Sequence, residues 1–127
     1  METINLLQIK LDNAQDGPRL LAIENWGDAS WVSMERAFTG CTNLQITATD
    51  TPDLSHVTNM SAMFAGCTNL NSPNNIGTWN TAAVTDMSFL FTDAREFNQD
   101  IGIWNTGNVI TMNSMFFQAL KFNQKLS

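Results

Sequence analysis

A Met followed four residues later by Phe recurs through this chain, and its regular spacing limits the folds open to it. The pairs are Met34 with Phe38, Met60 with Phe64, Met87 with Phe91, and Met112 with Phe116. Successive Met residues of these pairs are 26, 27 and 25 residues apart. A period this short is typical of tandem units that stack, because one unit cannot bury its apolar side chains alone. We therefore predict about four stacked units.

Other positions repeat in the same register. Eight residues before each Met stand Trp26, Pro52, Trp79 and Trp104, and three residues before it stand Trp31, Val57, Val84 and Val109. Three residues after each Phe comes a small side chain, in the order Cys41, Cys67, Ala94 and Ala119. Three residues further on comes a large one, in the order Leu44, Leu70, Phe97 and Phe122. An insertion within residues 72–75 accounts for the 27-residue step. Each of these columns is expected to run through a shared core.

The spacing inside one unit predicts its local structure. Apolar residues at i, i+4 and i+7, such as Met87, Phe91 and Ala94, are typical of one face of a short helix. The segment 97–104 carries apolar residues too closely spaced for a second helix and is expected to be extended. Asn-Thr pairs at 80–81 and 105–106 are turn formers whose side chains bond nearby backbone. Each unit of this α/β repeat is thus predicted to be a short helix plus a short extended segment or strand.

The 127 residues are expected to form a single repeat domain over residues 1–127. Residues 20–127 carry the repeats. Residues 1–19 do not match them, and their alternation of apolar and polar residues with a turn at Gly17-Pro18 predicts a capping strand or hairpin. The start of the chain has neither a basic segment nor a long apolar run, so no membrane insertion is expected, and a chain that begins at Met1 is expected in the cytoplasm.

The net charge of the chain limits the partners that it can bind. Charged residues are 14% of the chain and the net charge is −6, with six Lys and Arg that form no cluster. A molecule of this charge repels phosphate backbones, so we expect no nucleic-acid partner.

Few residues offer catalytic or metal-binding chemistry. Cys41 and Cys67 share a column with two Ala residues, which favours small buried thiols; a disulfide between neighbouring units is the alternative, disfavoured by the 8–10 Å spacing of packed helices. His56 is the only histidine, and its column also holds Ala83 and Asn108, which indicates an outward loop position. We expect no enzyme activity, no cofactor and no metal.

An Asn recurs as Asn71, Asn98 and Asn123. Exposed amides of this kind can bind a ligand, but repetition in one column favours bonds to the neighbouring unit's backbone.

Three segments resemble a known family: Val57-Thr-Asn-Met-Ser-Ala-Met-Phe-Ala-Gly-Cys67, Phe97-Asn-Gln-Asp-Ile101 and Trp104-Asn-Thr. They are similar to the BspA-like repeats of bacterial surface proteins, also described as the DUF285 or Mycoplasma lipoprotein repeat, over residues 20–127. The resemblance implies a short right-handed leucine-rich-repeat-like solenoid without enzymatic activity. It also implies a cell-surface or secreted protein that takes part in adhesion or host contact.

Two functional hypotheses follow. The first is a protein-interaction or adhesion module that contacts a protein or other macromolecular partner through outward positions, with the candidates Thr78, Gln99, Asp100, Ile103 and Gln124. The alternative is a structural protein that forms a homodimer through an uncapped C-terminal end, with the candidates Phe117, Leu120, Phe122 and Leu126. Truncation of a longer array would leave the same apolar end.

Overall fold

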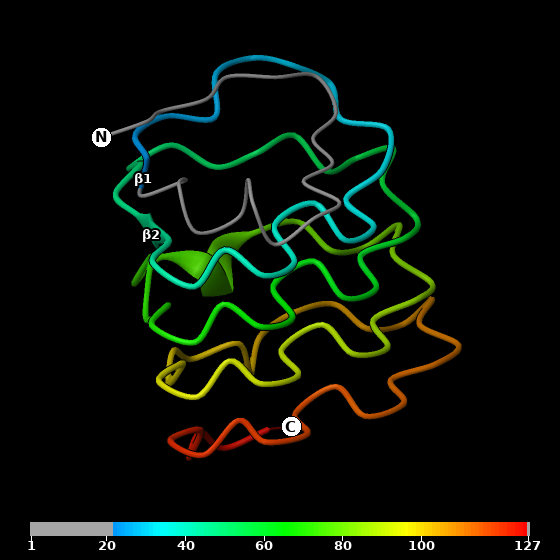
Figure 1. The fold of residues 1–127 in the computed structure, drawn as a ribbon. Helices are drawn as coiled ribbons and strands as arrows, with labels where there is room; N and C mark the ends of the chain where they lie inside the picture. Colours follow the sequence, from blue (N-terminus) through cyan, green and yellow to red (C-terminus); the bar gives the residue numbers. More distant parts are fainter. Residues whose placement is uncertain (1–21, 127) are drawn as a thin grey trace.

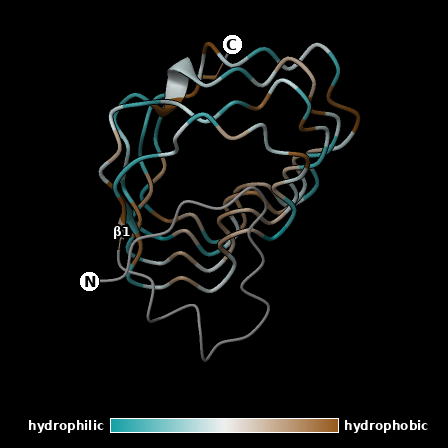
Figure 2. Ribbon diagram, turned by 90° about the horizontal axis from the view of Figure 1, so that it is seen from above, coloured by the Kyte–Doolittle hydropathy of each residue, from teal (hydrophilic) through white to brown (hydrophobic). Residues whose placement is uncertain are grey.

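The computed structural model describes residues 22–126, which form four layers lying one above another (Figure 1). We define the layers by the Trp and Pro column as residues 26–51, 52–78, 79–103 and 104–126. Seen from above, successive layers follow nearly the same outline (Figure 2). The predicted cap at residues 1–19 lies outside the described residues.

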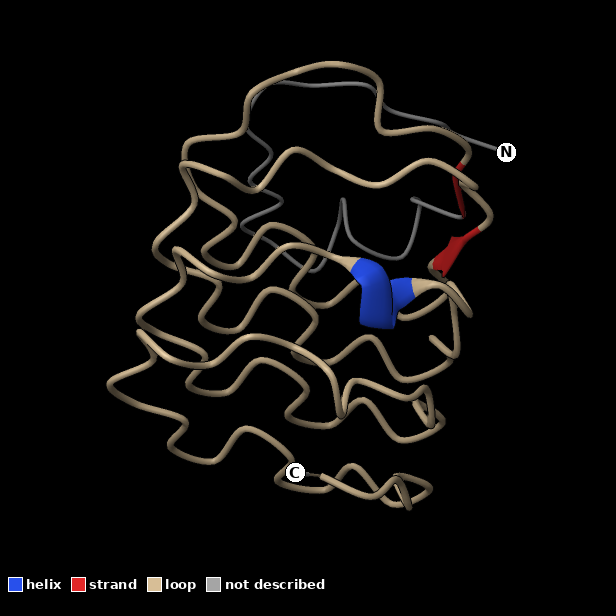
Figure 3. Cartoon of the chain, turned by 180° about the vertical axis from the view of Figure 1, so that it is seen from behind, coloured by secondary structure: helices blue, strands red, loops and turns tan. Residues whose placement is uncertain are grey.

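Regular secondary structure is sparse (Figure 3). Strands β1 (Ala22–Ile23) and β2 (Gln45–Ile46) pair in parallel, with Ala22 opposite Gln45. The 3-10 helix η2 spans Ile76–Thr78, directly after the insertion. No α-helix occurs in residues 22–126. The prediction of an α/β repeat, a right-handed leucine-rich-repeat-like solenoid of helix-plus-strand units, is therefore wrong.

Left-handed backbone explains why the expected helix does not form. Two residues after each repeat Met the φ angle is between 54° and 59°, at Arg36, Ala62, Phe89 and Ser114. Six residues after each Met it is again positive, between 59° and 78°, at Gly40, Gly66, Asp93 and Gln118. A left-handed residue interrupts a right-handed helix. The segment after each Met is consequently a series of tight turns.

Backbone hydrogen bonds hold the layers together in an alternating pattern. Four N–H groups of each of the first three layers donate to carbonyls of the next: from Met34, Arg36, Phe38 and Gly40; from Met60, Ala62, Phe64 and Gly66; and from Met87, Phe89, Phe91 and Asp93. These bonds are 2.8 to 3.1 Å long. The intervening residues instead close turns within their own layer, as where Ala37 N–H donates to the Met34 carbonyl. Each of the first three layers thus pairs alternate N–H groups of this segment with the next layer.

Side chains in register fill the interior. The rings of Phe38, Phe64, Phe91 and Phe116 form one stack with 5.8 Å between successive centroids and 10° to 12° between planes. The first three are fully buried. Pro52 breaks the Trp column, and the rings of Trp26 and Trp79 meet edge to face at 5.5 Å. These buried rings contribute to the stability of a chain that has little regular secondary structure.

The repeated Asn and turn residues bond as predicted. The Asn71 side-chain oxygen accepts from Asn98 N–H at 2.8 Å, and the Asn98 oxygen accepts from Asn123 N–H at 2.9 Å. Asn80 and Asn105 each accept from the backbone N–H two residues later. These amides stabilise the coil by pairing backbone groups that no helix or strand pairs.

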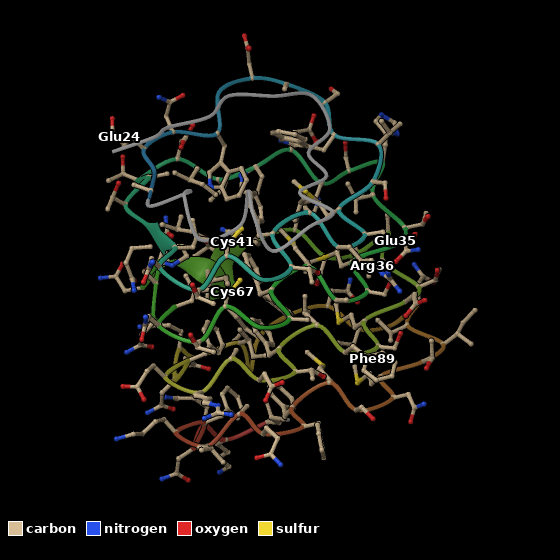
Figure 4. The ribbon with its side chains drawn as sticks, viewed as in Figure 1. Glu24, Glu35, Arg36, Cys41, Cys67 and Phe89 are labelled. Atoms are coloured by element: carbon tan, nitrogen blue, oxygen red, sulfur yellow. The ribbon has the colours of Figure 1, made fainter. Side chains whose placement is uncertain are left out.

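Replacing Phe91 by Ala should reduce the free energy of unfolding by about 3 to 5 kcal/mol, because the change leaves a cavity in the ring stack. The matched control is Phe89→Ala: Phe89 lies two residues away but is 44% exposed, at the edge of its layer (Figure 4), so its loss should cost less than about 1 kcal/mol. Denaturant unfolding of both variants measures the difference. Equal losses would contradict the packing described.

Candidate functional site

The outward positions predicted as a binding face are only partly available. The side-chain amide of Gln99 donates to the Asn71 backbone and side-chain oxygens, and that of Gln124 donates to the two oxygens of Asn98. Asp100 is exposed but accepts a hydrogen bond from Gly102 N–H. Thr78 is exposed, and its hydroxyl donates to the Asn75 carbonyl. Ile103, at 78% exposure, is the candidate whose side chain is most open.

The C-terminal layer differs from the others in its exposed apolar surface. Met112 is 44% exposed, whereas the Met residues of the same column in the preceding layers are buried. Leu126 is 52% exposed, whereas Ile101, one period earlier, is buried. The predicted self-association residues lie here: Phe117, Leu120 and Leu126 are exposed, and Phe122 is half-buried. In the preceding layers the positions of Met112 and Leu126 are covered by the next layer.

Phe117 and Leu120 are a separate feature from the open end of the stack. Phe117 stands in the column of Thr39, Ala65 and Thr92, and Leu120 in the column of Thr42, Thr68 and Arg95. None of those six residues is buried, although all lie in layers covered by a following one. The position of Phe117 and Leu120 in the last layer therefore does not by itself account for their exposure. Comparing the columns of the repeat would have revealed this switch from small or polar to large apolar side chains, which the sequence reasoning missed.

A cavity of about 130 Å³ lies between the last two layers, and neither Phe117 nor Leu120 lines it. It is mainly apolar, and its lining includes Trp104, Met112, Phe116 and Leu126. A volume near this is sufficient for a group the size of benzene. One apolar side chain of a partner would therefore fit.

Backbone donors also lie at this end. In every preceding layer the N–H groups at the repeat Met and at two, four and six residues beyond it donate to the next layer. The equivalent groups here belong to Met112, Ser114, Phe116 and Gln118, and they have no acceptor within residues 22–126.

The residues considered for catalysis are set apart from this end. His56 is exposed in a turn of the second layer, as predicted. Within the described part of the chain, no group of three or more His, Cys, Asp or Glu residues is placed to hold a metal ion. Hydrogen bonds from the Ser55 hydroxyl and N–H hold the pKa of Asp53 below its ordinary value. No helix in residues 22–126 is long and apolar enough to cross a membrane.

Cys41 and Cys67 are buried free thiols in adjacent layers (Figure 4), which confirms the expected small buried side chains. Burial raises the pKa of Cys41 from 9.0 to about 12, and burial also raises the pKa of Cys67 well above 9.0. The Cys67 thiol donates to the Phe38 carbonyl at 3.1 Å. The helix-spacing argument against a disulfide does not apply, because hydrogen-bonded layers replace the packed helices it assumed.

A family model described as "Mycoplasma protein of unknown function, DUF285" matches residues 32–127. The chain belongs to this family. The match begins just before the first repeat Met and covers all four Met-Phe pairs, so the family is recognised through the same repeat that builds the layers. No curated protein and no solved structure matches the sequence.

The thiols of the native protein should resist a disulfide reagent at pH 8, because with a pKa of about 12 only about one Cys41 in ten thousand is a thiolate. Unfolding in guanidinium should release two reactive thiols. The pKa of the Cys41 thiol is higher in the folded chain than in the unfolded one, so ionisation of this thiol favours unfolding. The free energy of unfolding is therefore unaffected by this group below about pH 9 and falls as the pH rises toward 12. Thiol titration before and after unfolding is the measurement, and finding no thiol after unfolding would show a disulfide instead.

Proposed function

We propose that the chain is a non-catalytic protein-interaction module that binds its partner through the C-terminal layer. The observation that carries the proposal is the exposure of Phe117 and Leu120 in columns that hold Thr, Ala or Arg in the other layers. Large apolar side chains at surface positions weaken solubility unless a partner covers them. The cavity lined by Met112, Phe116 and Leu126 of the same layer supports the proposal, since it offers a place for an apolar anchor of that partner.

The likeness to bacterial surface repeats supports the same proposal and suggests its setting, contact between a cell and its surroundings. Of the residues first considered for a binding face, Ile103 remains the best candidate for additional contact because it is exposed and apolar. Gln99 and Gln124 are poorer candidates, since binding through their amides would break bonds between layers.

Selection of a random displayed-peptide library on the immobilised chain tests this function. The double variant Phe117→Ser, Leu120→Ser should reduce the binding of selected peptides at least tenfold, because it removes the apolar contact surface. Val32→Ser is the control: Val32 is 63% exposed in the first layer, and its loss should leave binding unchanged. The proposal would be contradicted if the selected peptides bound the double variant as tightly as the native chain. It would also be contradicted if the native chain enriched no peptide from the library.

Self-association is the second candidate function, favoured by the same exposed residues. If two copies bury Phe117, Leu120 and Leu126 against each other, light scattering should show a dimer whose fraction rises with concentration. The variant Leu126→Ser should shift this equilibrium toward monomer. A native chain that stays monomeric at millimolar concentration would eliminate this candidate.

A further inference from the structure

We propose that a polar groove on the side of the stack is a binding site for an uncharged saccharide. The groove has a volume of about 480 Å³ and is lined by residues 46–49 of the first layer, residues 71–75 of the second and Gln99 of the third. A volume of this size lies within the range of small-molecule sites. Because its lining comes from the first three layers, the groove is a second site, separate from the C-terminal layer.

The insertion in the second layer accounts for the position of the groove. This layer has three residues, 73–75, between Ser72 and the buried Ile76. The equivalent segment of the third layer has one residue, Asp100. The 3-10 helix η2 follows the insertion and lies beside β2 (Figure 3). The longer loop cannot follow the regular register of the stack, and the groove forms where this loop meets the segment at 46–49.

The lining of the groove is uncharged and rich in hydroxyl and amide groups. Its polar residues within the described chain are Thr47, Thr49, Asn71, Ser72, Asn74, Asn75 and Gln99. The other lining residues, Ile46, Ala48 and Pro73, are apolar and buried. A charged ligand would lose water here without gaining a counter-charge. A saccharide fits both parts of the lining, because its hydroxyls pair with polar side chains while its C–H groups contact apolar ones.

Three amides of the groove are each held at one end and free at the other. Asn71 Oδ1 accepts from Asn98 N–H at 2.8 Å and from Gln99 Nε2 at 3.1 Å. The Asn71 Nδ2 donor and the Gln99 Oε1 acceptor have no partner in residues 22–126. Asn75 Nδ2 donates to the Thr49 carbonyl at 3.2 Å. Bonds between layers thus orient these amides before a ligand arrives, which reduces the entropy cost of binding.

The acceptor of Asn75 is a second observation that points to a ligand. Its Oδ1 atom is buried and has no hydrogen-bond partner within the described part of the chain. A buried acceptor without a donor is destabilising, and native structures usually supply one. The terminal torsion of an Asn side chain is broad. A rotation about it can turn this oxygen toward a ligand hydroxyl in the groove.

The backbone around the groove argues against an extended peptide as the ligand. A peptide that adds to a strand needs unpaired backbone N–H groups. Here Ile46 N–H donates to the Ser72 hydroxyl at 2.8 Å. The N–H groups of Thr47 and Ala48 both donate to the Ile23 carbonyl. The free polar groups of the groove therefore belong to side chains, and hydroxyls, which both donate and accept, match them better than a row of backbone amides.

An array of immobilised neutral and acidic oligosaccharides, probed with the labelled native chain, tests the ligand class. We expect neutral oligosaccharides to be bound. Their affinity should change by less than about twofold between low and high salt, because no charge of the groove takes part. Binding of acidic oligosaccharides alone, or of none, would overturn the proposal.

Two variants of exposed residues test the place of binding, by calorimetry with a neutral oligosaccharide selected on the array. Asn74→Ala removes an exposed side chain without a hydrogen bond in residues 22–126, so the fold should persist while binding weakens about fivefold, as for one lost hydrogen bond. Thr49→Trp fills the groove from an exposed position and should weaken binding at least tenfold. Asn25→Ala is the matched control, because Asn25 is exposed in the segment before the first layer and does not line the groove. Unchanged affinity in both groove variants, with native unfolding curves, would overturn the assignment of the site.

The same variants separate this site from the C-terminal layer. The double variant Phe117→Ser, Leu120→Ser should bind the oligosaccharide as tightly as the native chain does. Thr49→Trp should in turn keep its affinity for the library peptides that the native chain selects. If those peptides lose binding to Thr49→Trp and no saccharide is bound, the groove is a peptide site and the proposal fails.

Discussion

The backbone hydrogen bonds between layers are the interaction on which the rest of this structure depends. Each layer directs alternate N–H groups to its neighbour, and an unpaired buried N–H costs about as much as a lost hydrogen bond. The bonds set the layer spacing, and that spacing brings the Phe rings to 5.8 Å. They also hold equivalent side chains in columns, so that a repeat in the sequence becomes a repeat in the core.

The repeat and its core columns could be predicted from the sequence, but the local structure of each unit could not. Buried Met, Phe and small residues at i, i+4 and i+7 fit one face of a helix as well as they fit the series of tight turns that the structure shows. Gly40 and Gly66 were a signal for left-handed backbone, since they share a column. Arg36 and Phe89 gave no such signal. Their conformation costs roughly 1 to 2 kcal/mol each and is sustained by bonds to a neighbouring layer, which local sequence does not reveal.

The candidate site, too, could be predicted only in part from the sequence. The apolar C-terminal end followed from residue types alone, because the last unit has no described successor to cover it. The outward face could not be assigned so simply, since Gln99 and Gln124 lie at the surface yet use their amides between layers. Phe117 and Leu120 are visible as an anomaly only when each column is compared across all four units. The side of the layer on which a residue lies indicates whether it is accessible, whereas comparison along a column shows which side chains differ from their equivalents in the other layers.

The alternating bond pattern also gives the stack a direction, and this limits how it can associate. Side-chain contacts between apolar surfaces are compatible with a two-fold dimer, because such contacts impose no polarity. Backbone pairing at residues 112–118 is not compatible with a two-fold dimer, since this segment offers N–H donors at alternate positions and needs carbonyl acceptors opposite them. A symmetric dimer would therefore bury Phe117 and Leu120 while leaving the donor row to solvent. Each interface between the described layers, by contrast, combines such a donor row with the Phe stack. Main-chain polarity thus gives the described layers a single direction of stacking.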